Sequence, residues 1–303
     1  GEELLRQREM CIDPYTRVAN RSSELVEMDV KTVLTLEKSA KGLRVATTIC
    51  NQAKDHRVRV ILPTGLDTSM HMADSAFVRR NNRHNDTWTN PCGCERQQCF
   101  VAMEDAKGGL LVANRGLYEY EILEDQGNAV AVTLLRCVAE MGDWGYFPTP
   151  KAQQIGTFCL EFEVVPFAAG ETGDAFREGY AFQEDLTVEQ AGLERAFLRK
   201  PGQVKPELVE GELPLEMSFL AFEGDGIHMT AFKKGQKKDD LFVRFVNNME
   251  HEEVLSFKKE DWMKEVYRSN VIEEKGDLMI PDKDGVYHVA LREFEIATFG
   301  IVK

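Results

Sequence analysis

The sequence lacks both a long hydrophobic run and an excess of positive charge. No run of about 18 consecutive apolar residues occurs in its 303 residues, so we expect no membrane-spanning helix. The N-terminal stretch GEELLRQREM is charged and has no apolar core, so no signal peptide is expected and a cytoplasmic location is predicted. Lys and Arg number 37 against 51 Asp and Glu, and the net charge of −14 argues against nucleic acid and anionic membranes as partners.

The chain also lacks a recognisable metal-binding spacing. Among its seven cysteines, Cys92, Cys94 and Cys99 form a C-x-C-x4-C pattern, which is not a standard zinc spacing. A fourth ligand would have to come from a remote cysteine or from His84. The other histidines are scattered without ligand spacing. We therefore predict no metal ligand in this chain and free thiols in a reducing compartment.

A β-α-β alternation is absent, which argues against Rossmann and TIM-barrel folds. Short segments rich in β-branched and aromatic residues predominate instead, and they predict an all-β protein. The predicted strands cover residues 32–36, 43–49, 57–62, 99–103, 110–114, 118–123, 129–135, 158–165, 217–222, 227–232, 241–246, 254–257, 287–291 and 295–301. One helix is predicted over residues 186–198, with Thr187 as its N-cap and Gln190 three residues later.

Two loops carry aromatic side chains. The long polar stretch 79–98 contains Trp88 together with Arg79, Arg80 and Arg83, and such loops are often functional. It either binds a sugar or an acidic group, or forms a contact between domains or subunits. Trp144 and Tyr146 lie in a second loop, where capping of the core is the favoured interpretation and ligand contact the alternative.

The stretch 51–77 resembles a passage in the C-terminal half of the family 38 glycoside hydrolases, the α-mannosidases. The residues that carry this resemblance are Asn51, Asp55, His56, Arg57, Arg59, Pro63, Thr64, Gly65, Ala73, Asp74, Ser75 and Phe77. Further passages follow in the same order as in the family, at residues 108–121, 133–138, 148–156, 243–248, 270–274 and 294–299. The similarity spans about residues 28–303 and is most like the cytoplasmic bacterial branch that includes mannosylglycerate hydrolase-like enzymes.

The resemblance implies two β domains. Residues 1–205 are expected to form a galactose-mutarotase-like supersandwich, and residues 206–303 a smaller antiparallel β-sandwich. In the family, a catalytic (β/α)7 barrel that binds Zn²⁺ and a helical domain precede these domains. The nucleophile passage Asp-x-Phe-Gly does not occur here. Because a retaining glycosidase needs two carboxylates about 5 Å apart, which the family keeps in its barrel, we assign no catalytic residue to this chain.

Arg115 is the candidate substrate-binding residue. In the family, an arginine at the end of the corresponding strand reaches the active-site cleft, and a guanidinium suits sugar hydroxyls or a carboxylate aglycone. The alternative is a structural salt bridge with Glu119 or another acid. The group Asp55, His56, Arg57 and Arg59 is interpreted as a network that holds its strand to a neighbouring domain, with substrate contact as the alternative. Strand alternation places Arg57 and Arg59 on one face.

The predicted function is that of the non-catalytic C-terminal region of a retaining α-mannosidase, which supports the barrel and forms part of the cleft wall. The expected partners are the chain's own N-terminal catalytic barrel and helical domain, a mannosidic glycan or mannosyl conjugate, and a second copy in a homo-oligomer. Two alternatives stay open. One is an independent carbohydrate-binding module, and the other is an aldose-epimerase-like enzyme that pairs His71 or His84 with Glu95 or Glu104.

Overall fold

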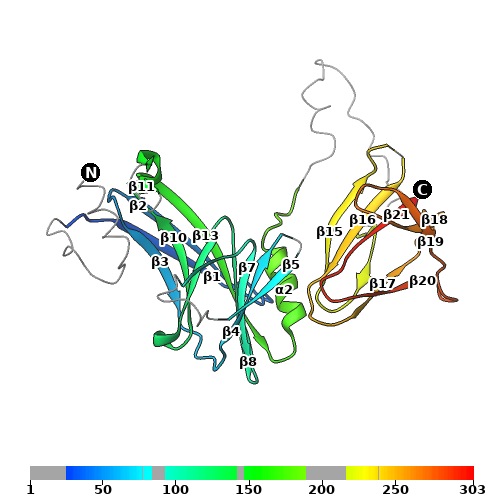
Figure 1. The fold of residues 1–303 in the computed structure, drawn as a ribbon, viewed down its shortest axis with the longest axis horizontal. Helices are drawn as coiled ribbons and strands as arrows, with labels where there is room; N and C mark the ends of the chain where they lie inside the picture. The colour runs from blue at the N-terminus through cyan, green and yellow to red at the C-terminus, as the bar shows by residue number, and fades with distance from the viewer. Residues whose placement is uncertain (1–24, 77, 84–92, 142–146, 189–215, 238) are drawn as a thin grey trace, which may run out of the picture. The chain divides into compact units, whose positions relative to one another are not determined.

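A computed structural model describes residues 25–76, 78–83, 93–141, 147–188, 216–237 and 239–303, with the side chains of 78–83 left aside. The chain divides into two compact units, Gly1–Gln183 and Glu184–Lys303 (Figure 1). The domain boundary expected between residues 205 and 206 falls within 189–215, outside the described residues. No helix in the described parts is long and apolar enough to cross a membrane.

The first unit is built from two large antiparallel sheets, and β11 and β12 form a small two-stranded sheet beside them. The seven-stranded sheet has the order β1-β2-β13-β8-β7-β4-β5, and the four-stranded sheet has the order β3-β10-β9-β6. Its strands are β1 (Asp29–Thr35), β2 (Leu43–Asn51), β3 (Arg57–Leu62), β4 (Met70–Ser75), β5 (Val78–Arg83), β6 (Cys94–Arg96), β7 (Phe100–Asp105), β8 (Gly108–Asn114), β9 (Glu119–Leu123), β10 (Ala129–Arg136), β11 (Glu140–Met141), β12 (Phe147–Pro148) and β13 (Gly156–Ala168). Two 3-10 turns, η1 (Glu124–Gln126) and η2 (Pro150–Gln153), interrupt them.

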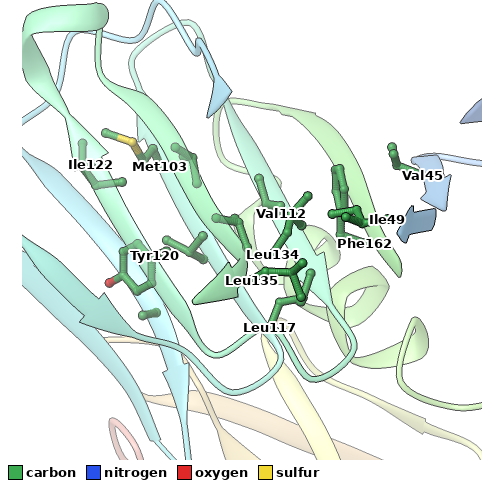
Figure 2. Close-up of a cluster of buried hydrophobic side chains, with 14 of the residues drawn as sticks. Val45, Ile49, Met103, Val112, Leu117, Tyr120, Ile122, Leu134, Leu135 and Phe162 are labelled. Atoms are coloured by element: carbon green, nitrogen blue, oxygen red, sulfur yellow. The ribbon is translucent and has the colours of Figure 1, made fainter. Parts of the chain in front are cut away.

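A single hydrophobic cluster joins the two sheets of this unit. It takes Ile49 from β2, Val112 from β8 and Phe162 from β13, and it takes Tyr120 and Val132 from the four-stranded sheet. Figure 2 shows part of this cluster between the strands. The alternation of buried and part-exposed residues along β2 follows from this arrangement, because every second side chain points into the shared core. The unit is therefore a large β-sandwich, as the sequence predicts.

Helix α2 (Thr172–Ala181) packs on the seven-stranded sheet. The ring of Phe176 stacks on Phe100 with centroids 5.0 Å apart, and the ring of Tyr180 meets Phe100 edge-on at 5.2 Å. A Cβ on Gly179 would lie 2.7 Å from the Phe100 ring, so the glycine permits this close approach. The sequence did not predict this helix. The helix predicted over 186–198 lies mostly outside the described residues, and its described part, 186–188, is not helical.

The second unit is a smaller antiparallel sandwich, as predicted. A three-stranded sheet of order β14-β17-β20 and a five-stranded sheet of order β15-β16-β21-β18-β19 share one core cluster. Its strands are β14 (Phe222–Glu223), β15 (Ile227–Lys234), β16 (Leu241–Asn247), β17 (Glu253–Lys258), β18 (Glu265–Ser269), β19 (Lys275–Leu278), β20 (Val286–Leu291) and β21 (Ile296–Val302). The all-β prediction is confirmed for both units.

Several local predictions were wrong. The strand expected over 217–222 is reduced to Phe222–Glu223, and β18 and β19 were missed. The stretch 79–98 is not one long loop, because β5 and β6 begin and end it. β5 is polar in sequence but pairs along its whole length with β4, so the pairing makes it a strand. Trp88, His84, Cys92, Trp144 and Tyr146 lie outside the described residues.

Candidate functional site

Arg115 directly follows β8 and is held by the first unit's own residues. Its Nε donates a hydrogen bond to the Phe182 carbonyl at 2.8 Å, and its Nη1 lies 3.3 Å from Glu161 Oε2. The guanidinium carbon lies 4.8 Å from the centre of the Phe182 ring, a cation–π contact. The side chain nevertheless keeps 31% of its surface exposed. Arg115 is thus fixed in direction and still has exposed surface for a ligand.

Among the described residues, Arg115 pairs with Glu161, an acid that the sequence did not single out. Strand β13 runs antiparallel to β8 with Phe162 opposite Asn114, and Arg115 N donates to the Glu161 carbonyl at 3.2 Å. This register brings Glu161 and Arg115 together across about 46 residues of chain. Glu119, the acid named from the sequence, contacts Arg57 and Arg136.

The arginines of β3 form a charged network on the four-stranded sheet. Arg57 lies 3.3 Å from Glu119 and 3.4 Å from Glu121, and Arg59 also contacts Glu121. Both side chains therefore lie on one face of β3, as alternation predicts, while Val58 and Val60 pack against the core. Arg136 on β10 contacts Glu119, which joins a third strand to the network.

Glu119 is the centre of this network. Burial raises the pKa of its carboxyl, but the hydrogen bond from Thr133 at 2.8 Å and the charges of Arg136 and Arg57 outweigh burial and leave the pKa below its usual range. The carboxylate is therefore charged and paired at neutral pH. These contacts tie β3, β9 and β10 of a single sheet to one another, so a structural role accounts for them.

Among the described residues, no hydrogen bond or ion pair joins Asp55 or His56 to the Arg57–Glu119 network. The Asp55 amide donates to Gln153 Oε1 at 2.9 Å, and Gln153 Nε2 donates back to Asp55 Oδ1 at 2.7 Å. Asn51 Nδ2 likewise donates to the carbonyls of Gln153 and Gln154. Two of the passages noted in the sequence, 51–77 and 148–156, thus bind each other. Both ring nitrogens of His56 are enclosed, and neither has a hydrogen-bond partner among the residues described.

A comparison with protein families matches residues 226–299 to the model described as "Glycosyl hydrolases family 38 C-terminal beta sandwich domain". A protein of Halalkalibacterium halodurans named "Putative mannosylglycerate hydrolase" is 34% identical over 277 residues, which cover 90% of this chain and 29% of that protein. The chain is thus similar to the C-terminal β region of glycosyl hydrolase family 38 proteins.

Solved structures extend the family 38 match to both units. An α-mannosidase from Enterococcus faecalis V583 aligns with a TM-score of 0.77 and 32% identity, over 100% of this chain and 32% of that one. A glycosyl hydrolase family 38 protein from the same species aligns with a TM-score of 0.76 and 30% identity, over 100% of this chain and 33% of that one. The chain spans about a third of the length of these relatives.

Among the described residues, the histidine–glutamate pairs predicted for an epimerase-like enzyme do not form an open site. His71 on β4 is 4% exposed, and its ring meets the Tyr120 ring edge-on at 5.5 Å inside the sandwich. Glu104 accepts hydrogen bonds from Gly170 N and Thr172 Oγ1 at the start of α2, on the other face of the sheet. Glu95 lies opposite Tyr120 across the β6–β9 pair. An enclosed His71 is out of reach of a substrate, and His84 lies outside the described residues.

The described cysteines and the remaining described histidines are dispersed. Cys94 Sγ lies 2.9 Å from Arg57 Nη1, whereas the Cys99 amide donates to Asp74 Oδ2 at 3.1 Å. His251 contacts Glu253, and His288 contacts Asp282. Across the described part of the chain, no group of three or more His, Cys, Asp or Glu side chains is arranged to hold a metal ion.

Proposed function

We propose that this chain is the non-catalytic β region of a retaining α-mannosidase, where it supports the catalytic barrel and forms part of the cleft wall. The observation that carries the proposal is the alignment of the whole chain with about a third of an E. faecalis α-mannosidase at 32% identity. The substrate class proposed for the parent enzyme is a mannosidic glycan or a mannosyl conjugate. In the parent, a divalent metal such as Zn²⁺ would be held by the upstream catalytic domain and not by this chain.

The exposed edge of the first unit supports a covering partner. Strand β1 is an edge strand of the seven-stranded sheet, and every one of its residues is exposed. Val30, Val33 and Leu34 expose 53%, 47% and 63% of their surface. An exposed apolar edge strand invites pairing with another chain or segment. We infer that the upstream barrel and helical domain of the parent cover this edge, while a homo-oligomer contact is the second use proposed for it.

The cytoplasm is the proposed location. The described cysteines, Cys50, Cys94, Cys99, Cys137 and Cys159, are all free thiols, and free thiols persist in a reducing compartment. The acidic balance of the sequence also fits a protein without nucleic-acid or membrane partners.

The proposal is tested by assaying the purified chain on an aryl α-mannoside, with and without Zn²⁺, and again after the upstream region is added or fused. We expect no turnover from the chain alone and metal-dependent turnover from the combination. The matching deletion of residues 28–303 from the parent should abolish activity. Metal-dependent turnover by the chain alone, or full activity after the deletion, would contradict the proposal.

Arg115 is proposed to face the cleft of the parent enzyme and to bind substrate. Arg115→Ala in the parent should lower kcat/KM about tenfold, equivalent to about 1.4 kcal/mol, because one charge-assisted hydrogen bond is lost. Arg177→Ala is the matched control, since this α2 arginine is 57% exposed and pairs only at the surface with Asp174 at 3.0 Å. An unchanged kcat/KM together with a lower Tm in Arg115→Ala would assign Arg115 a purely structural role with Glu161.

A further inference from the structure

A polar cavity of about 290 Å³ lies in the first unit, where the turn between β1 and β2 meets β13 and the end of α2. Its charged lining consists of three cations and three carboxylates, and the Phe182 ring lies beside them. The cations are Lys38, Lys41 and Arg44, and the carboxylates are Glu37, Glu163 and Glu178. All of these residues are described, and none belongs to the Arg57–Glu119 network. The volume is close to the lower end of small-molecule sites, roughly 300 Å³.

Glu163 is the buried group of this cavity. The residue is 7% exposed, and it lies opposite Arg44 in the β2–β13 pair. Arg44 Nε is 3.6 Å from Glu163 Oε1, which makes an ion pair but is longer than a normal hydrogen bond. Burial raises the pKa of this carboxyl, and the charge of Glu178 adds to the rise, against the opposing effect of Arg44 and Arg115. Among the described residues, Arg44 is the ion-pair partner of this carboxyl, and the two oxygens of a carboxylate can accept several hydrogen bonds.

The turn residue Gly42 fixes the backbone close to this carboxyl. A Cβ at Gly42 would lie 2.7 Å from Glu163 Cδ and 2.9 Å from Oε1. Any larger residue would displace the Glu163 side chain, so the turn and the carboxyl are fitted to each other.

The second ion pair and the aromatic ring complete the wall. Lys41 Nζ lies 3.3 Å from Glu178 Oε1, and these two side chains are 57% and 32% exposed. Phe182 lines the same cavity and also receives the Arg115 guanidinium in its cation–π contact. The cavity therefore offers acceptors, donors and an apolar ring, and it shares Phe182 with the candidate substrate-binding arginine.

We propose that this cavity binds a neutral polyhydroxylated ligand, a single sugar residue of a glycan. Sugar hydroxyls donate to carboxylates such as Glu163 and Glu178 and accept from Lys41 and Arg44, so they use both signs of charge at once. Cations and carboxylates are equal in number in this lining, so its net charge favours neither a free anion nor a free cation. The choice of mannose as the sugar rests on the proposed function, whereas the cavity and its chemistry do not.

The experiment uses the chain by itself with methyl α-D-mannopyranoside as the probe. Saturation-transfer difference NMR detects binding, and a titration of the signal gives the Kd. Lys41→Met removes a donor at the exposed mouth without touching the core, and Glu163→Gln removes the buried charge at constant size. Each should weaken binding about tenfold or more. Lys234→Met is the control, because this lysine also pairs with a carboxylate, Asp239, but does so at the surface of the second unit.

The binding results distinguish a sugar site from the absence of one and from an anion site. Weaker binding in both cavity variants, with the control unchanged, supports the site. The site is overturned if methyl α-mannoside, α-glucoside and α-galactoside all fail to give a signal. It is also overturned if binding is observed that neither variant weakens. Saturable binding of inorganic phosphate at the cavity in place of the sugars overturns the neutral-ligand assignment. If Glu163→Gln fails to fold by circular dichroism, Lys41→Met decides the matter. Because the assay needs no hydrolysis, its failure leaves the proposed role in the parent enzyme untouched.

Discussion

Replacing Gly300 by alanine should destabilise the second unit by about 3 kcal/mol, at the upper end of the usual cost of overpacking a core. Gly300 on β21 lies directly opposite Tyr267 on β18, and the tyrosine ring covers the glycine. A Cβ at Gly300 would lie 2.1 Å from Tyr267 Cζ and 2.4 Å from Cε2. No atom can occupy that position unless the ring moves.

The ring of Tyr267 has little freedom to move. It is fully buried, its hydroxyl donates to Asp240 Oδ2 at 2.7 Å, and it meets the Phe242 ring edge-on at 6.3 Å. Burial, together with the hydrogen bond to Asp240, also raises the pKa of this tyrosine, so it stays protonated and keeps donating. The new methyl group must therefore push the ring off its hydrogen bond or push the two strands apart.

The measurement is hydrogen exchange of amides in β16 and β21, which reports the second unit separately from the first. A double-mutant cycle with Tyr267→Leu supplies the control, because the cost of Gly300→Ala should shrink once the ring is gone. If Gly300→Ala were instead neutral or stabilising, as expected where a glycine in a strand merely costs entropy, the described contact between ring and glycine would be wrong.

Some elements of the fold can be predicted from local sequence patterns, and others depend on contacts between distant residues. Strand β2 was predicted because one of its faces must be buried, and β10 because it is a nearly continuous apolar run that is buried on both faces. Strand β19, with the sequence KGDL and every residue exposed, carries no such pattern. Helix α2 contains Gly173 and Gly179, which weaken a helical pattern, and Gly179 is there because Phe100 comes close. Elements β19 and α2 depend on contacts with residues elsewhere in the sequence, so a short stretch of sequence does not predict them.

In the candidate site, too, local alternation was predictable from the sequence, whereas the ion-pair partners were not. The alternation of β3 predicts that Arg57 and Arg59 share a face, and the structure confirms it. Their acids come from β9 and the acid of Arg115 comes from β13, and both pairings depend on strand register. Asparagines in the passages that resemble family 38 form structural hydrogen bonds that the sequence did not predict. Asn247 Nδ2, for example, donates to the carbonyls of His251, Leu291 and Arg292, which closes the end of the second sandwich.

The second unit should also lose about 2 kcal/mol of stability between pH 7 and pH 5 because of His228 alone. Burial in β15 lowers the pKa of this histidine from 6.5 to about 4. The unfolded chain therefore binds a proton near pH 6.5, while the folded unit resists protonation until about pH 4. Stability is full above pH 6.5, falls as the pH drops below it, and has lost about 3 kcal/mol once the pH is below 4.

This loss is separable from the titration of other groups. The carboxyls with lowered pKa values among the described residues of this unit are those of Asp239, Glu273, Asp282 and Glu295. They lose their stabilising effect only below their ordinary pKa values of 3.8 for aspartate and 4.5 for glutamate. Between pH 7 and pH 5, His228→Gln should therefore flatten the stability profile measured by hydrogen exchange in β16 and β21, after correction for intrinsic exchange. His251→Gln is the control, because that side chain is exposed and sits 2.7 Å from Glu253, so its replacement should leave the acid-dependent loss in place. A His228→Gln profile that still falls by about 2 kcal/mol would mean that another group binds the proton on unfolding, and that His228 is hydrated in the folded unit.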